Sequence, residues 1–269
     1  MGFIAFSSDW GLKSYYVGVC KAIMKRISPS SPIIDLTHEI EPFNAKEAMH
    51  ILYRAFNHFP PQTVFLVVVD YGVGTERKAI ALETESHYFF VGPDNGIFTL
   101  IIEEEKIKSI VELNNPDFFY LSQPTATFHG RDIFAPASAY LSQGTPIEKL
   151  GEFLLLSDLS LLPYQKSFFS KGKLIGEIAF FDRFGNIETN IPSHLFEQFN
   201  LKKGKEVMVE LGSKKIVSRY SSTYGEVPAG EFTIHVDSSG YVEISENHGN
   251  AKACLGVEQS ELISLEPVQ

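Results

Sequence analysis

Residues 64–77 read VFLVVVDYGVGTER, and this stretch carries the clearest signal for the fold. Six apolar residues follow one another from Val64 to Val69, which is typical of a strand covered on both faces of a sheet. A carboxylate, Asp70, stands directly after the run, and the loop that follows contains two glycines. The stretch therefore predicts a central strand that ends in a loop able to approach a ligand closely.

The chain on the amino side of this strand alternates between strand-like and helix-like patterns. In chain order, strands are expected at residues 3–6 and 32–36, and helices at 15–27 and 44–59. This βαβαβ order predicts a mainly parallel sheet with helices on both faces. Ligands of such sheets bind beyond the carboxyl ends of the strands, where Asp9 and Asp70 are expected.

The chain beyond Asp70 continues the same domain and then changes character. Strands at residues 80–82 and 88–91 and a helix within 132–141 are expected next. After about residue 163, short strand-like runs are separated by glycines, a pattern that favours a small antiparallel barrel or sandwich. The runs are 174–181, 207–211, 232–236 and 241–244.

These patterns predict two domains. An α/β domain with a mainly parallel sheet is expected over residues 1–163, a linker over 164–172, and an all-β, barrel-like domain over 173–269. A length of 269 residues agrees with two hydrophobic cores, because chains of this size commonly divide into domains.

The composition argues against several classes of protein. The net charge is −10, with 23 basic and 33 acidic residues, so the chain lacks the basic footprint that a nucleic acid requires. The N-terminus has no basic start before a long apolar run, and no stretch reaches the ~18 apolar residues of a membrane span. The two cysteines, Cys20 and Cys254, belong to no CxxC pair. A soluble, cytoplasmic protein without nucleic-acid or membrane partners is expected.

Two segments of the α/β domain contain residues suited to catalysis. In the first, Arg77 follows Asp70 closely, and the pair either forms the mouth of a ligand site or is a structural ion pair. In the second, His129 precedes Arg131 and Asp132, and a carboxylate near an imidazole can orient it for proton transfer near neutral pH. The residue types alone leave the catalytic and the structural interpretations open.

The remaining polar segments carry weaker signals. Asp9 follows the first strand, where a carboxylate can accept hydrogen bonds from a ribose diol or can cap the next helix. Residues 182–186 and 237–240 have the composition of ordinary turns. His38 suggests a metal ligand, but no second histidine stands at a metal-binding spacing from it, so a metal site is not expected.

Seven segments, taken together, resemble the S-adenosyl-L-methionine (SAM) hydrolase family, also called hydroxide adenosyltransferases, which is related to fluorinase and chlorinase. In order from residue 7 to residue 251 they are SSDWGLKSYYVG, DLTHEIEPFN, VVVDYGVGTERKAI, VGPDNGIFTL, TFHGRDIFAPASA, DRFGNIETNI and VDSSGYVEISENHGNA. No single segment is specific, but seven in the family's order across nearly the whole chain are. The resemblance implies an N-terminal α/β domain, a C-terminal β-barrel and a homotrimer with active sites at subunit interfaces.

The resemblance also implies roles for residues on the matching segments. Asp70, Arg77 and His129 look like the trio that positions and activates the water that attacks C5′ of SAM. The residues that resemble substrate contacts are Asp9 for the ribose hydroxyls, Phe43 for the ribose and sulfonium side, Phe184 and Tyr224 for the two faces of the adenine, Asn186 and the backbone near Ala251 for its edge, and Asp182, Ser238 and Ser239 for the amino and carboxylate groups of methionine. SAM is then the substrate and adenosine a product, and neither a cofactor nor a metal is implied.

The distinction from the related halogenases depends on two positions. Fluorinase-like enzymes carry tyrosine where this chain has Asp70, and a halide-binding serine where it has Gly130. A carboxylate beside the nucleophile repels halide and favours a polarised water, so hydrolysis is expected. Two departures from the usual pattern of the hydrolases, Tyr71 in place of proline and Ser14 in place of an acidic residue, affect loop stiffness and the contacts to the methionine end.

Other interpretations of the same pocket are a halogenase, a non-catalytic sensor of adenosine or SAM, and a metal-dependent hydrolase that uses Asp9, His38 and Asp70. The complete trio argues against a sensor, and Asp70 with Gly130 argues against a halogenase. The sequence does not determine the preferred sulfonium epimer, the physiological role or the residue that takes the proton.

Overall fold

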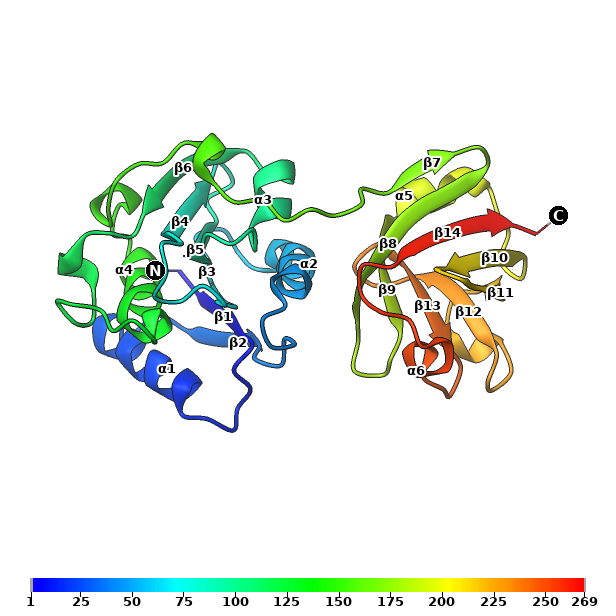
Figure 1. Cartoon of the computed structure of the whole chain (residues 1–269), viewed down its shortest axis with the longest axis horizontal. Coiled ribbons are helices and arrows are strands. Elements are labelled where there is room, and N and C mark those ends of the chain that lie inside the picture. Colours follow the sequence, from blue (N-terminus) through cyan, green and yellow to red (C-terminus); the bar gives the residue numbers. More distant parts are fainter. Residues whose placement is uncertain (1, 269) are drawn as a thin grey trace. The chain divides into compact units, whose positions relative to one another are not determined.

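The computed structural model describes residues 2–268 and divides the chain into two compact units between Leu162 and Pro163 (Figure 1). The first, the N-terminal unit, contains a mostly parallel sheet with helices, and the second, the C-terminal unit, is built mainly of strands that close into a barrel. The predicted fold class is therefore confirmed. None of the helices among residues 2–268 has the length and apolar character needed to cross a membrane.

The sheet of the N-terminal unit has six strands in the order β2-β1-β3-β5-β4-β6. The strands are β1 (Ile4–Ser8), β2 (Ile33–Thr37), β3 (Val64–Val68), β4 (Ala79–Thr84), β5 (Phe89–Pro93) and β6 (Ile107–Glu112). β1 pairs in parallel with β2 and β3, and β3 pairs in parallel with β5, whereas β4 is antiparallel to β5 and β6. Every residue of β3 is buried, as the unbroken apolar run predicts.

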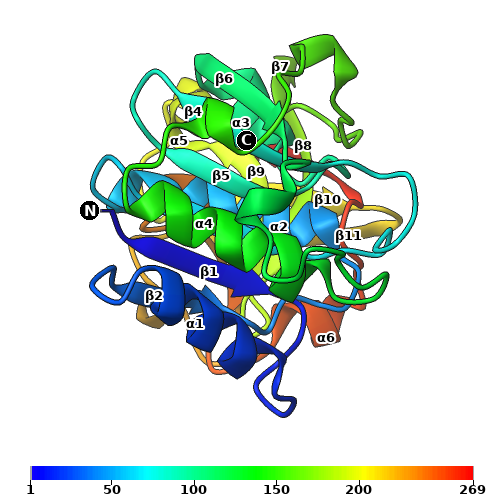
Figure 2. The same ribbon diagram turned by 90° about the vertical axis from the view of Figure 1, so that its left-hand side faces the viewer.

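Helices cover both faces of this sheet. They are α1 (Tyr16–Ile27), α2 (Ala45–Ala55), α3 (Thr99–Glu104) and α4 (Ala135–Ser142), with a π-helical turn η3 (Gly130–Phe134) before α4 and 3-10 turns η1 (Phe56–His58), η2 (Pro116–Phe118), η4 (Ile147–Lys149) and η5 (Leu156–Asp158). Successive side chains of a strand point to opposite faces. Leu66 and Val68 accordingly pack with α1 and α4, which face the viewer in Figure 2, whereas Phe65 and Val67 pack with α2 and α3.

The C-terminal unit is a closed barrel. Its strands are β7 (Phe168–Ser170), β8 (Lys173–Phe181), β9 (Ile187–Pro192), β10 (Glu206–Leu211), β11 (Lys214–Tyr220), β12 (Phe232–Val236), β13 (Tyr241–Glu246) and β14 (Leu262–Pro267), with short helices α5 (Ser193–Phe196) and α6 (Ala251–Leu255) and 3-10 turns η6 (Glu197–Phe199) and η7 (Tyr224–Glu226). The order is β14-β10-β11-β12-β13-β9-β8-β7, and pairing of β14 with β8 closes a ring of all strands except β7. The ring is not purely antiparallel, because β11 and β12 pair in parallel.

Part of the segment predicted as a linker is ordered structure of the barrel. Residues 164–172 include β7, which pairs antiparallel with β8, and the backbone N–H of Gln165 donates to the Glu177 carboxylate at 3.0 Å. The segment therefore belongs to the C-terminal unit. β7 escapes detection in the sequence because it has only three residues, and its Phe168 and Phe169 are both exposed instead of alternating between buried and exposed.

Candidate active site

An ion pair occupies the loop that follows β3. Asp70 comes two residues after the end of β3, and Arg77 folds back onto it. The Arg77 Nε donates to Asp70 Oδ1 at 2.8 Å, and its Nη2 donates to Asp70 Oδ2, so the contact is bidentate. The side chains of Arg77 and Asp70 are only 9% and 7% exposed, so solvent screens this pair weakly and its geometry is well defined.

Two glycines allow this loop to fold back. A Cβ at Gly72 would lie 2.9 Å from Arg77 Cγ, so a side chain there would push the arginine away. A Cβ at Gly74, where φ is +76°, would lie 2.2 Å from the carbonyl oxygen of Ala126. The glycines thus permit the close approach between this loop and the segment that carries His129.

The third member of the predicted trio completes the arrangement. Arg77 Nη2 lies 3.0 Å from His129 Nδ1. Because a guanidinium can only donate, Nδ1 must be the acceptor, and the proton of the neutral imidazole is then on Nε2. Burial and the charge of Arg77 lower the pKa of His129, which keeps the ring neutral at pH 7. His129 therefore offers an N–H donor at Nε2, while its Nδ1 is occupied.

Asp70 and His129 line a cavity of about 390 Å³. This volume is in the range of small-molecule sites. The rest of the lining comprises four aromatic residues, Trp10, Tyr15, Tyr16 and Phe128, together with Val68, Val73, Thr125, Thr127, Gly130 and Arg131. Aromatic rings beside the ion pair weaken its screening by solvent and so strengthen its electrostatic interaction. These aromatic residues were not predicted as site residues, although Trp10 directly follows Asp9 and Phe128 directly precedes His129 in the chain.

Gly130 brings the wall and the trio together. It starts the π-helical turn η3, directly after His129, and a Cβ at this position would lie 2.5 Å from Trp10 Cη2. Turns of this kind frequently occur at functional sites. The indole of Trp10 therefore occupies the space where any other side chain at position 130 would begin.

Asp9 and Phe43 meet at the carboxyl end of β1. The backbone N–H of Phe43 donates to Asp9 Oδ2 at 2.9 Å, although the two residues are 34 positions apart. Phe43 has a φ of +68°, which is strained for a phenylalanine, and its side chain is 69% exposed. Burial raises the pKa of Asp9, and the Phe43 N–H partly offsets this effect. The strained turn thus positions a carboxylate and presents an aromatic ring.

The turn between β8 and β9 carries part of the predicted adenine site. Asp182 Oδ1 accepts from the backbone N–H groups of Phe184 at 2.9 Å and Asn186 at 2.8 Å, and its Oδ2 accepts from Asn186 Nδ2 at 2.9 Å. Phe184 is 74% exposed at the tip. The backbone N–H of Lys252 donates to the Gly185 carbonyl at 2.9 Å, which brings the neighbouring Ala251 to this turn.

The residues predicted at the methionine end and on one adenine face line a second cavity, also of about 390 Å³. Its lining includes Asp182, Tyr224 and Ser238, as predicted, and also His235 and Glu243, which the sequence analysis did not identify. Ser239 is not part of this lining, and its hydroxyl donates to Asp237 Oδ2 at 2.7 Å. The ring of Tyr224 packs edge-to-face on His235, with centroids 4.8 Å apart.

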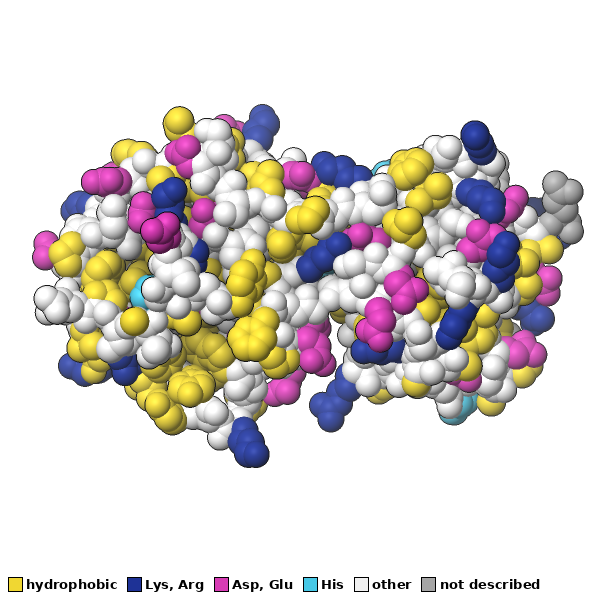
Figure 3. Space-filling model, viewed as in Figure 1, with side chains coloured by type: hydrophobic (Ala, Val, Ile, Leu, Met, Phe, Trp, Pro, Cys, Tyr) yellow, Lys and Arg dark blue, Asp and Glu magenta, His cyan; other side chains and the backbone are white. Residues whose placement is uncertain are grey.

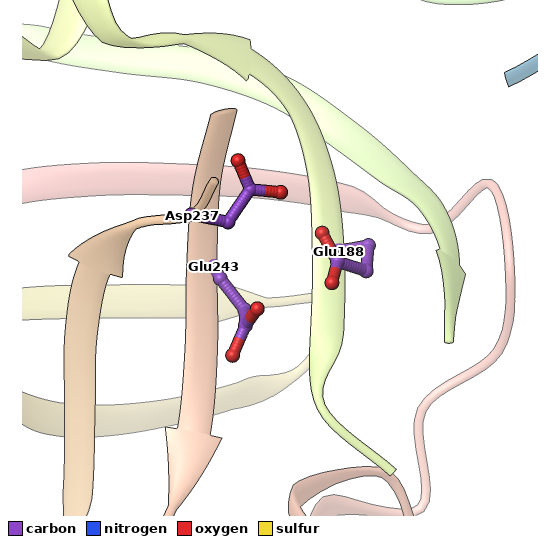
Figure 4. Close-up of side chains that lie close together, drawn as sticks. All are labelled: Glu188, Asp237 and Glu243. Atoms are coloured by element: carbon purple, nitrogen blue, oxygen red, sulfur yellow. The ribbon is translucent and has the colours of Figure 1, made fainter. Parts of the chain in front are cut away.

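Three carboxylates gather on the wall of this second cavity (Figure 4). Glu188 comes from β9, Glu243 from β13, and Asp237 from the turn between β12 and β13, and one oxygen of each lies within 4.8 Å of the others. Burial raises the pKa of Glu243, but hydrogen bonds from His235 and Ser245 outweigh this and lower it. The cavity therefore has a negative wall, which favours a cationic ligand group.

Comparisons with known proteins add to this geometry. Models of the SAM hydroxide adenosyltransferase N-terminal and C-terminal domains match residues 4–151 and 176–264. An (R)-S-adenosyl-L-methionine hydrolase of Thermus thermophilus is 35% identical over 95% of this chain and 96% of its own, and a fluorinase of Actinopolyspora mzabensis is 27% identical over 91% and 90%. The crystal structure of an uncharacterized conserved protein from Thermotoga maritima matches with a TM-score of 0.94 and 48% identity over 98% of this chain and 100% of that one.

Proposed function

The chain belongs to the SAM hydroxide adenosyltransferase family, and on that premise we propose how its residues hydrolyse SAM to adenosine and methionine. The observation that carries the proposal is the hydrogen-bonded unit of Asp70, Arg77 and His129 beside an aromatic cavity. A carboxylate acceptor and an imidazole N–H donor at one cavity are the two groups needed to orient a water molecule.

The reaction itself requires little acid–base chemistry. The water oxygen attacks C5′ of the ribose, the C5′–S bond breaks, and its electron pair stays on sulfur, so the positive sulfonium leaves as a neutral thioether. No general acid is needed for this leaving group. The attacking water becomes strongly acidic as its bond to carbon forms, so a weak base is sufficient to take the proton.

Asp70 is the residue we assign as proton acceptor. His129 cannot accept through Nδ1, because Arg77 donates to that atom, and its Nε2 carries the ring proton. Each carboxylate oxygen of Asp70 has a second lone-pair direction besides the one that Arg77 uses. In this scheme His129 donates a hydrogen bond to the water oxygen, and Asp70 accepts a proton of the water. Arg77 holds Asp70 and His129 in place.

The substrate contacts follow the family resemblance and are supported by the local geometry. We propose that Asp9 accepts from the ribose hydroxyls and that Phe43 lies beside the ribose and sulfonium. Phe184 and Tyr224 would stack on the adenine, with Asn186 and the backbone near Ala251 at its edge; Asp182, Ser238 and Ser239 would hold the methionine end. The negative wall of the second cavity favours the cationic α-amino group of that end.

A homotrimer with active sites at subunit interfaces is part of the same proposal. Several large hydrophobic side chains of the N-terminal unit are exposed, namely Leu12 (68%), Tyr15 (69%), Phe43 (69%) and Tyr71 (56%). Figure 3 shows hydrophobic side chains gathered on one face of this unit, over α1 and the loop before it. Exposed apolar patches of this kind mark interaction sites, and a second copy of the chain is the partner we propose.

The relatives also suggest the stereochemistry of the substrate. The hydrolase of Thermus thermophilus is named for the (R) epimer at sulfur, and we propose the same preference here. We further propose a cytoplasmic reaction without metal or cofactor, in which SAM is only a substrate. The free thiols of Cys20 and Cys254 agree with a reducing compartment, and activity that persists in excess chelator would support metal independence.

Halogenation is the alternative that the family includes. The Asp70 carboxylate beside the nucleophile position repels halide, and Trp10 fills the space at Gly130 where a halide-binding serine would stand. A sensor without turnover would have no use for a buried donor–acceptor pair at the reacting end of its pocket. Both alternatives are separated from hydrolysis by their products.

The test is incubation of the pure protein with each SAM epimer in ¹⁸O-labelled water, with and without chloride or fluoride. We expect adenosine that carries the label in its 5′-hydroxyl, unlabelled methionine, and faster conversion of the (R) epimer. Unlabelled adenosine would contradict direct attack of water, a 5′-halogenated product would favour the halogenase, and binding without any product would favour the sensor.

A further inference from the structure

A hydrogen-bonded chain outside the proposed trio connects β2 with the end of β1. Ser8 Oγ lies 2.7 Å from His38 Nδ1, and His38 Nε2 lies 3.1 Å from Asp35 Oδ1. Lys21 from α1 donates to the other oxygen of Asp35 at 2.5 Å. Ser8 and His38 are buried, with 0% and 4% exposure, whereas Asp35 and Lys21 extend toward solvent. The chain thus leads from the surface to the loop that carries Asp9.

The carboxylate of Asp35, at the surface end, determines which group donates in every hydrogen bond of this chain. The Asp35 carboxylate only accepts, so His38 carries its proton on Nε2 and leaves a lone pair on Nδ1. Ser8 must then donate its hydroxyl proton to Nδ1. The Ser8 oxygen is left to accept, and the backbone N–H of Trp10 donates to it at 3.4 Å. A neutral His38 is therefore the partner that this arrangement requires.

The same histidine holds the loop at a second point. Its carbonyl oxygen accepts from the backbone N–H of Gly11 at 2.7 Å, so the contacts of His38 lie on both sides of Asp9 and Trp10. The Phe6 ring packs edge-to-face on His38, with centroids 4.7 Å apart, and on Trp10, at 5.8 Å. Residues 8–11 are thus attached to His38 by a side-chain and a backbone hydrogen bond, and Phe6 packs between His38 and Trp10.

We propose that His38 is a positioning residue whose neutral imidazole sets the conformation of residues 8–11, and with it the ribose acceptor Asp9 and the cavity wall Trp10. The ribose role of Asp9 rests on the proposed function, whereas the effect on Trp10 does not. Trp10 connects this hydrogen-bonded chain with the proposed catalytic trio, because its indole lies against Gly130, next to His129. Protonation of His38 releases the loop.

The reason for this release is the loss of an acceptor. A protonated imidazole donates from both nitrogens, so the Ser8 hydroxyl, buried with 0% exposure, would have no acceptor for its proton at His38. The charged groups that face His38 are Asp35 and Glu39, which favour protonation, and Lys21, which opposes it. Burial outweighs the two carboxylates and lowers the pKa of His38 below its usual 6.5, so the switch operates on the acidic side of that value.

The experiment uses Trp10 as its reporter, because it is the only tryptophan in the chain. The fluorescence of the intact protein, without substrate, is titrated from neutral to acidic pH and compared with adenosine affinity at the same pH values. We expect one shift of Trp10 emission with a midpoint below 6.5, and a parallel loss of adenosine affinity of about tenfold, of the order expected for one charge-assisted hydrogen bond.

Four variants separate His38 from other titrating groups. His38→Asn keeps an acceptor for Ser8 but does not titrate, so it should abolish the emission shift and retain near-normal adenosine affinity, whereas His38→Leu should lose affinity at every pH. Ser8→Ala removes the link and should also abolish the shift. Ser7→Ala, next to it, should behave as the parent protein, because Ser7 Oγ has no hydrogen-bond partner. Circular dichroism identifies any variant that fails to fold.

The outcomes are distinguishable from those of the proposed function. An unchanged acid shift in folded His38→Asn and Ser8→Ala would overturn the proposal and assign the titration to Asp9 or His129. Normal adenosine affinity of His38→Leu together with an unchanged Trp10 emission would likewise overturn it. If the emission shift follows the prediction but no hydrolysis is found, the proposed function fails and the positioning role of His38 for Trp10 remains.

Discussion

The two units differ in how far their candidate residues are already held in place by other side chains. In the N-terminal unit, Asp70, Arg77 and His129 already contact one another, and the side chains of Asp70 and Arg77 are largely buried. In the C-terminal unit, Phe184 is 74% and Tyr224 41% exposed. Groups that orient a water must be rigid before the substrate arrives, because reorganisation during the reaction adds to the barrier. Groups that recognise a flat ring need an open face.

The largest expected effect tests the rigid half. Asp70→Asn preserves the shape of the side chain but removes the charge that Arg77 binds and that we propose as the acceptor of the water proton. Turnover should fall by about two orders of magnitude or more, within the range for a general base. Adenosine affinity, measured by calorimetry, should change little. Asp117→Asn, at an exposed site in η2, is the matched control. Equal losses of affinity and turnover would identify Asp70 as a structural carboxylate.

The next effect tests the open half. Phe184→Ala and Tyr224→Ala each remove one stacking face, which is worth ~1–3 kcal/mol for a base on an aromatic ring. Adenosine should therefore bind roughly 5- to 150-fold more weakly by calorimetry. Phe168→Ala, 43% exposed on β7 of the same unit, should leave the affinity unchanged. Normal affinity in both variants would show that adenine does not stack on Phe184 and Tyr224, and their exposure would then not be related to adenine binding.

A smaller effect concerns the packing behind the trio. Gly130→Ala places a Cβ 2.5 Å from Trp10 Cη2, and we expect it to destabilise the protein by about 1–3 kcal/mol, as overpacking usually does. Gly18→Ala, in α1 with no atom within 4 Å of its Cβ, should instead stabilise by up to ~1 kcal/mol. Denaturant unfolding measures both. Equal stability of the parent and Gly130→Ala would show that the Trp10 side chain can shift away from the added Cβ at little cost in free energy.

The mildest effect is a dependence on pH. Burial lowers the pKa of His38 and of His129, so the unfolded chain binds these protons at a higher pH than the folded protein. The free energy of unfolding should therefore fall as the pH decreases below about 6.5, until the folded-state pKa values are reached. Turnover should fall only at the lower end of this range, where His129 of the folded protein becomes protonated and can no longer accept from Arg77. A stability independent of pH in this window would contradict the neutral state of both rings.

Several features of the fold could be predicted because they depend on local pattern. The apolar run 64–69 indicated a buried strand, and the order of strands and helices indicated a parallel sheet, since both reflect periodicity and chain order. β6, β9, β11 and β14 were not predicted as strands. β11 lies in a charged stretch and most of its residues are exposed, so it lacks an apolar pattern. β14 is a strand because it pairs with β10 and β8, and these pairings cannot be read from its own residues.

The sequence by itself determined the two domains, the identity of Asp70, Arg77 and His129 as candidates, and the resemblance to a family. It could not decide between a catalytic trio and a structural ion pair, and it offered His38 only as a poor metal ligand. The tertiary structure adds the contacts on which the proposals for these residues depend, because it joins Arg77 to His129 across 52 positions and Ser8 to His38 across 30. The tautomer of each histidine depends on which of its nitrogens faces an obligatory donor or acceptor, and only the folded chain brings those partners together.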